Sequence, residues 1–119
     1  MRLRFPKSSR LNRVSEFARL RREGVSLHGK FMILSVLRGG ADMETRFGFV
    51  TSRRVGGAVE RNRARRRLRE IVRADQPGIA ANSWIVIVAR QSATRADFDQ
   101  LRNEWRALAQ RSGTLTPDA

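Results

Sequence analysis

Arginine is concentrated in one segment of the chain, between residues 53 and 73. This segment holds nine arginines and two glutamates, so it carries +7 of the chain's net charge of +14. The guanidinium group is a planar donor that binds phosphate in a bidentate manner and stacks on bases. The segment therefore indicates a site for a polyanion. Its arginines are Arg53, Arg54, Arg61, Arg63, Arg65, Arg66, Arg67, Arg69 and Arg73.

The part of this segment from about residue 58 to residue 74 is predicted to be a helix with a core face and a basic face. At 100° per residue, four apolar side chains fall within about 100° of one another. They are Ala64, Leu68, Ile71 and Val72. The opposite stripe consists of Asn62, Arg66, Arg69 and Arg73, flanked by Arg63 and Arg65, with Arg61 near the edge of the apolar face. Arginines four residues apart repel each other and destabilise a helix. A solvated surface is one interpretation. An anionic partner better explains a helix face whose like charges destabilise the helix.

Two further features of this segment each have two interpretations. Asn62 can read a base edge or a 2′-hydroxyl of RNA, or it can cap the helix or hydrogen-bond to the backbone near the start of the helix. Gly56 and Gly57 precede the helix. They can expose backbone N–H groups to a phosphate, or they can be ordinary turn glycines. The lysine and hydroxyl of a nucleotide-binding P-loop are missing from this pattern.

The whole composition points to the same class of partner. The pI is about 12.0, and 23 of the 25 basic residues are arginine. A pI this high favours a nucleic acid, or less often an anionic membrane surface. The preference for arginine over lysine is explained equally well by codon usage in a GC-rich genome. The chain has no cysteine, which excludes disulfides and thiolate metal sites.

Other side chains offer little chemistry of their own. Phe17, Phe31, Phe47 and Phe49 can form a stacking platform for unpaired bases, although aromatic residues on a small sheet are more often core. His28 is the single histidine, so a Ser-His-Asp triad or a histidine metal site is not expected. The carboxylates are scattered and resemble no two-metal nuclease site. We expect no catalytic residue and no metal ligand in the protein.

The remaining pattern predicts a single α+β domain over residues 1–119. We expect a basic flexible arm over 1–10, a globular domain over 11–110 and a polar tail over 111–119. The predicted helices cover 15–23, 58–74 and 98–108, and the predicted strands cover 25–27, 31–37, 46–51 and 84–89. This α-β-β-β-α-β-α order favours a two-layer sandwich with helices packed on one sheet. The strand at 46–51 is expected to form a hairpin with the strand before it. No signal peptide or membrane span is evident, so a cytoplasmic protein is expected.

Residues 51–70, with the sequence TSRRVGGAVERNRARRRLRE, resemble the signature of the protein subunit of bacterial ribonuclease P. The likeness extends over about residues 10–110. Arg10-Leu11, Glu16-Phe17 and Gly24 are similar to the family's amino-terminal helix, and residues 84–108 are similar to its last strand and helix.

The resemblance implies a fold and a function. The fold would have one mostly antiparallel sheet and a left-handed β-α-β crossover, whereas general rules favour a right-handed one.

The protein would bind the catalytic RNA and the single-stranded 5′ leader of precursor tRNA, and it would broaden the substrate range. RNA would perform the hydrolysis with Mg²⁺, which it would mainly hold itself. No membrane and no obligate protein partner are implied. RNA contacts would come from Arg53, Arg54, Arg61, Asn62, Arg63, Arg65, Arg66, Arg69 and Arg73, and the leader cleft from Phe17, Phe31 and Phe49.

The chain departs from the family pattern at three positions. Gly57 stands where many members have asparagine, and Arg21 and Leu34 stand where cleft aromatics are common. These departures predict leader binding that depends more on charge and less on stacking. Two alternatives remain: a general RNA-binding or ribosome-associated protein without a role in tRNA processing, and a nuclease that acts without RNA. The scattered carboxylates argue against the second.

Overall fold

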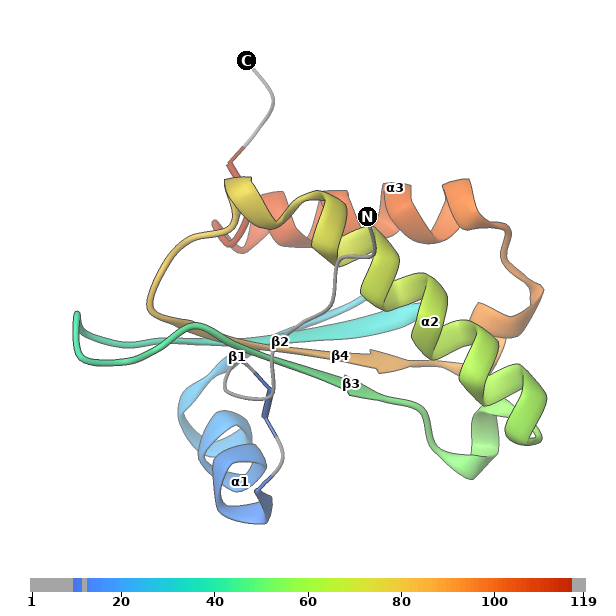
Figure 1. Cartoon of the computed structure of the whole chain (residues 1–119), viewed down its shortest axis with the longest axis horizontal. Helices are drawn as coiled ribbons and strands as arrows, with labels where there is room; N and C mark the ends of the chain where they lie inside the picture. Colours follow the sequence, from blue (N-terminus) through green and yellow to red (C-terminus); the bar gives the residue numbers. More distant parts are fainter. Residues whose placement is uncertain (1–9, 12, 117–119) are drawn as a thin grey trace.

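The computed structural model describes residues 10, 11 and 13–116, and it confirms the predicted order of elements (Figure 1). The helices are α1 (Val14–Glu23), α2 (Ala58–Ala74) and α3 (Phe98–Arg111). The strands are β1 (Val25–His28), β2 (Met32–Arg38), β3 (Arg46–Val50) and β4 (Ser83–Ala89). Three short 3-10 helices join them: η2 (Arg53–Val55), η3 (Gln76–Gly78) and η4 (Gln91–Arg95). The predicted bounds of α2 agree with those observed.

The four strands form one mixed sheet in the order β1-β2-β4-β3. The pairs β1/β2 and β2/β4 are antiparallel, and β3/β4 is parallel. The expected hairpin between β2 and β3 is therefore wrong, because β4 lies between these two strands. Ile85, Val86 and Ile87 of β4 are all buried, so this strand is apolar on both faces and suits the centre of the sheet.

Helices cover both faces of the sheet (Figure 1). Helices α2 and α3 lie together on one face, where the main core includes Leu34, Leu68, Ile87 and Trp105. Helix α2 also connects the parallel neighbours β3 and β4, which gives the expected β-α-β unit. The handedness of this connection stays a prediction.

Helix α1 lies on the other face and packs through a smaller apolar cluster of Leu11, Leu20, Leu37 and Val86. An ion pair between Arg46 of β3 and Glu16 of α1 fixes the start of this helix. Glu16 also accepts the backbone N–H of Arg13, at 3.1 Å. The amino-terminal helix is thus tied to the sheet by both apolar packing and charge.

The two expected flexible ends are only partly described. Residues 1–9 and 117–119 lie outside the described residues, but Arg10 forms a parallel bridge with Phe47 of β3. At the other end, Thr114 and Leu115 are buried, and Leu115 pairs with Ile79. The first part of the expected polar tail, up to residue 116, therefore folds back on the domain, because Leu115 supplies an apolar side chain to the main core.

Candidate nucleic-acid interface

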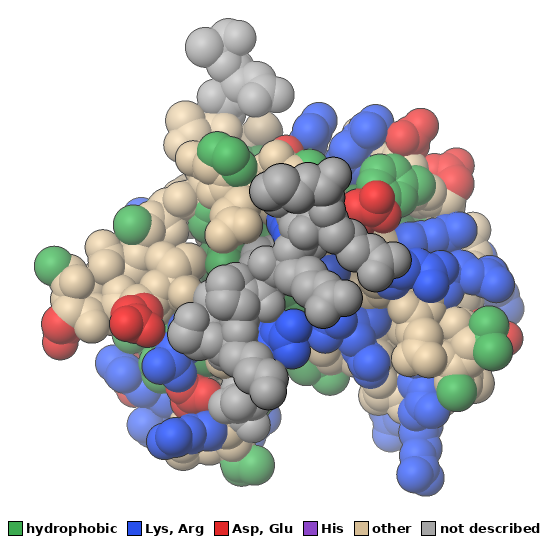
Figure 2. Space-filling view, in the orientation of Figure 1, with side chains coloured by type: hydrophobic (Ala, Val, Ile, Leu, Met, Phe, Trp, Pro, Cys, Tyr) green, Lys and Arg blue, Asp and Glu red, His purple; other side chains and the backbone are tan. Residues whose placement is uncertain are grey.

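Helix α2 presents its basic face to solvent because its other face is anchored in the core. Ala64, Leu68, Ile71 and Val72 are the buried residues of the helix, as predicted. On the opposite side, the exposed residues include Asn62, Arg63, Arg66 and Arg69. In space-filling view, Lys and Arg side chains gather over α2 (Figure 2). The helix therefore holds several guanidinium groups on one rigid surface.

The turn before α2 adds two more arginines to this surface. Val55 is buried, which holds η2 against the domain and leaves Arg53 and Arg54 exposed. Gly56 follows with φ 152°, a conformation that L side chains rarely adopt, so glycine is required there. The glycine therefore turns the chain into α2 while both arginines stay on the surface.

The phosphate site expected at Gly56-Gly57 is opposed by a neighbouring carboxylate. A Cβ built on Gly57 would stand 3.0 Å from Oε2 of Glu60. A negative charge this close to the backbone repels a phosphate. The structure thus favours the turn interpretation of the two glycines. Gly57 itself has φ −72°, a conformation that other residues also adopt.

Asn62 is exposed and does not cap the helix. The N-cap position of α2 is occupied by Gly57, five residues earlier. The interpretation of Asn62 as the cap of this helix is therefore wrong. Its amide lies beside Arg63 and Arg66 on the solvent side, where it can reach a partner.

Arg65, Arg67 and Arg69 of α2 make contacts within the protein. Nη2 of Arg65 donates to Oγ1 of Thr51 at 2.6 Å, and Nη1 of Arg67 donates to the carbonyl of Ala96 at 3.3 Å. The guanidinium of Arg69 lies 5.9 Å from the ring centroid of Phe49. Partial burial lowers the pKa of Arg69, and the nearby charges of Arg10 and Arg65 lower it further. Arg10, which was expected in the flexible arm, therefore belongs to this basic surface.

The Thr51 hydroxyl is predicted to position Arg65. Replacing Thr51 by valine keeps the shape but removes the acceptor, which should lower the free energy of unfolding by about 1 kcal/mol. Urea unfolding of Thr51→Val, Arg65→Ala and the double variant measures the coupling between the two side chains. If the two effects simply add, the hydrogen bond does not contribute to stability.

The three phenylalanines expected in the leader cleft do not lie together. Phe17 of α1 packs beside Gly48, so closely that a Cβ on this glycine would stand 3.3 Å from Cε1 of the ring. Phe49 and Phe31 pack instead against the main core, on the side of α2 and α3. Successive strand residues face opposite sides of a sheet, and Phe49 shares its side with the buried Phe47. Phe31 and Phe49 therefore do not share a face with Phe17 and α1, and their assignment to the leader cleft stays a prediction.

The sheet face beside α1 is mainly aliphatic, with the ring of Trp84 as its aromatic member among the strand residues of the cluster. Val50 and Val88 are partly buried in the cluster with Phe17. Ile33 pairs with Val88, and Ser35 pairs with the buried Val86, so both point to the same face. The alternation of side chains along β2, β3 and β4 is the sequence signal that could have identified Ile33, Val50 and Val88. Leu34 is fully buried on the other side of the sheet, whereas Arg21 is exposed on α1.

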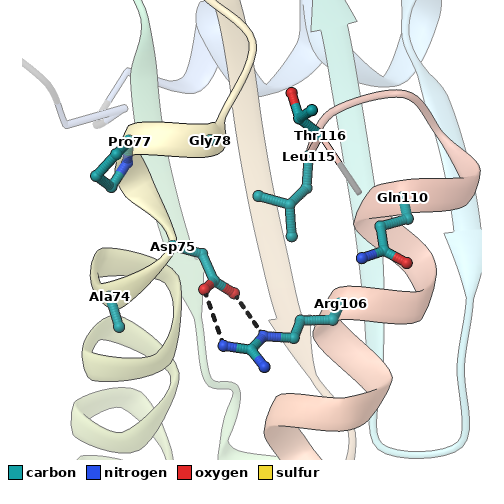
Figure 3. Close-up of a pocket in the computed structure, with 8 residues that line it drawn as sticks. All are labelled: Ala74, Asp75, Pro77, Gly78, Arg106, Gln110, Leu115 and Thr116. Atoms are coloured by element: carbon teal, nitrogen blue, oxygen red, sulfur yellow. Dashed lines mark hydrogen bonds and ion pairs between the residues drawn. The ribbon is translucent and has the colours of Figure 1, made fainter. Parts of the chain in front are cut away.

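A cavity of about 170 Å³ lies between the C-terminal end of α2 and helix α3 (Figure 3). Asp75 and Arg106 point toward each other at its wall, and the carboxylate accepts two hydrogen bonds from the guanidinium, both at 3.1 Å. It also accepts Nε1–H of Trp105 at 2.9 Å. These charges neutralise each other, so we assign this site a structural role.

Over the described residues, no group of three or more His, Asp or Glu side chains is placed to hold a metal ion. Within the same residues, no helix is long and apolar enough to cross a membrane.

A family model described as ribonuclease P matches residues 5–113 of the chain. The match spans both the basic surface on α2 and the face that carries α1. The chain belongs to the ribonuclease P protein family. The resemblance found in residues 51–70 is thereby confirmed, and this signature corresponds to η2 and the first turns of α2.

Curated members of the ribonuclease P protein family resemble the chain over most of its length. The ribonuclease P protein component of Symbiobacterium thermophilum is 38% identical over 109 residues, which cover 92% of this chain and 95% of the relative. That of Chloroflexus aurantiacus is 44% identical over 108 residues, covering 89% and 78%.

Solved structures of the family share the fold. The ribonuclease P protein of Thermotoga maritima superposes with a TM-score of 0.75 at 30% identity, covering 86% of this chain and 96% of that one. The protein of Staphylococcus aureus gives a TM-score of 0.83 at 24% identity, covering 92% and 100%, and supports the fold alone.

Proposed function

We propose that this chain is the protein subunit of a ribonuclease P ribonucleoprotein that removes the 5′ leader of precursor tRNA. The observation that carries the proposal is the exposed arginine surface on α2. Six of the predicted contact residues are exposed on α2 and on the turn before it: Arg53, Arg54, Asn62, Arg63, Arg66 and Arg69. Like charges on one helix face repel each other, and an RNA backbone relieves this repulsion. This surface is assigned to the catalytic RNA.

The face beside α1 is assigned to the single-stranded leader of precursor tRNA. Its floor of Ile33, Val50 and Val88 is apolar, Phe17 borders it, and Arg21 adds positive charge from α1. Aliphatic side chains contact bases without the stacking that aromatic rings provide. Leader binding would therefore depend more on charge than on stacking, and little on base identity.

Hydrolysis is assigned to the RNA subunit with Mg²⁺. The carboxylates of the described residues form no metal-binding cluster, so no protein residue is assigned to the ion. The protein would contribute by binding and orienting the substrate, which broadens the range of precursors that are cleaved.

Cleavage of precursor tRNA at low Mg²⁺ tests the proposal. We expect the RNA subunit from the same organism and this protein to be active together, and each to be inactive alone. A protein that gives no enhancement would refute the proposal. Ribosomal RNA as the main copurifying RNA would favour a ribosome-associated protein, and cleavage by the protein alone would indicate a nuclease.

Phe17 and Phe31 provide a matched pair for testing the leader site. Phe17→Leu reduces the aromatic surface beside α1 and should weaken binding of a precursor with a long leader about threefold to tenfold. Phe31→Leu changes the opposite side of the sheet and should have no effect. Binding of mature tRNA, which lacks a leader, serves as the control for both variants. Equal effects of the two changes would contradict the assignment of the leader to the α1 face.

A further inference from the structure

An exposed valine lies in the middle of the arginine surface on α2. Val59 has 67% of its surface exposed and belongs to neither apolar cluster. At 100° per residue it lies within about 20° of Arg66 and 40° of Arg63, so its side chain points to the same side of the helix as these two arginines. The core of the protein does not explain an apolar side chain at this position.

The helix itself gains nothing from valine at this position. A β-branched side chain loses rotamer freedom in a helix, and alanine is the better helix former. Isolated apolar residues on a surface are common, as Val14 and Val25 illustrate, with 83% and 63% of their surfaces exposed. Val59 differs from these two because it shares a helix face with Asn62, Arg63 and Arg66, which would bind RNA.

We propose that Val59 packs against a nucleoside surface of the ribonuclease P RNA, the ribose or the face of a base, while Arg63 and Arg66 bind flanking phosphates. The proposal rests on the function proposed above. A phosphate backbone held by two neighbouring guanidiniums brings its sugars and bases close to the helix. Their C–H edges and faces are the apolar surfaces that RNA offers. The arginines select an anionic partner, and the valine favours the uncharged part of it.

The proposal predicts a loss of affinity that does not depend on salt. Phosphate contacts release counterions and set the slope of log K against log salt, whereas an apolar contact does not. Val59→Ala should weaken binding of the RNA subunit about fivefold at every salt concentration, because two methyl groups lose their contact. Val59→Thr, which keeps the shape but adds a hydroxyl, should have a similar effect. Arg66→Ala should instead lower the slope by about one unit.

Binding of the transcribed RNA subunit to the full-length protein, measured at several salt concentrations, tests this proposal. Val14→Ala is the matched control, since Val14 is also an exposed valine in the first turn of a helix. The affinity of the Val14→Ala protein for the RNA subunit should stay within twofold of wild type. Thermal unfolding of Val59→Ala should occur at or above the wild-type temperature, so that a loss of affinity is not due to unfolding.

Three outcomes would count against the role of Val59: unchanged affinity in Val59→Ala, an equal loss in Val14→Ala, or an altered salt slope in Val59→Ala. Failure of the proposed function has a different signature. In that case the wild-type protein would bind an unrelated structured RNA of the same length as tightly as the RNA subunit.

Discussion

Arg66→Glu is expected to weaken binding of the ribonuclease P RNA roughly a hundredfold at moderate salt. The guanidinium lies on the exposed face of α2, opposite the buried Leu68 and Ile71. The change removes a charge-assisted contact and places a carboxylate next to a phosphate. The slope of log K against log salt should fall by at least one unit, and Arg66→Ala should show the same loss of slope with a smaller loss of affinity. Stability should change little, because the side chain is exposed.

Arg111→Glu is the matched control for this experiment. Arg111 is an exposed residue at the end of α3, and its reversal changes the net charge by the same amount. Its affinity should stay within about threefold of wild type, since only the long-range attraction is altered. If both variants lose affinity equally, RNA responds to the total charge of the protein, and the assigned surface is wrong.

Asp75→Ala is expected to lower the free energy of unfolding by about 3 kcal/mol. The carboxylate accepts hydrogen bonds from Trp105 and Arg106, and only 12% of its side chain is exposed (Figure 3). Its removal leaves a fully buried indole N–H and a partly buried guanidinium without their acceptor. The midpoint of thermal unfolding should fall by about 10 °C.

Asp99→Ala provides the comparison for Asp75→Ala. Asp99 pairs with Arg102 at 3.0 Å, but 72% of its side chain is exposed, and such a pair contributes less than about 0.5 kcal/mol. RNA affinity at 25 °C should be unchanged in both variants, because the site lies at the far end of α2. A similar loss of stability in the two variants would show that the network around Asp75 has no special role.

The features of α2 could be predicted because they depend on local periodicity. Four apolar side chains at helical spacing determined both its bounds and its buried face, and the arginines then had to face solvent. The pairing of β3 could not be predicted in this way. Chain neighbours commonly form hairpins, and only the apolar character of β4 on both faces indicated that a later strand would separate β2 from β3.

The two faces of the sheet were predicted less well than the arginine surface. Alternation along β3 puts Phe47 and Phe49 on one side of the sheet. It did not say which helices cover that side, since this depends on long-range packing. The side of the sheet on which Leu34 and Phe31 pack depends on the same long-range packing. Arg10 was missed because its position beside Arg69 follows from the bridge to Phe47, which leaves no periodic signal in the sequence.

The position of β4 also constrains the order in which the protein can form during synthesis. This strand is the last of the four to leave the ribosome, yet β2 and β3 both pair with it. Until residue 89 has emerged, β3 has no neighbour in the sheet, and the apolar face of α2 lacks much of the surface that covers it. A nascent chain of this length already exposes the complete arginine segment. The arginine segment is therefore exposed to cellular RNA before the domain that holds these side chains in place can fold.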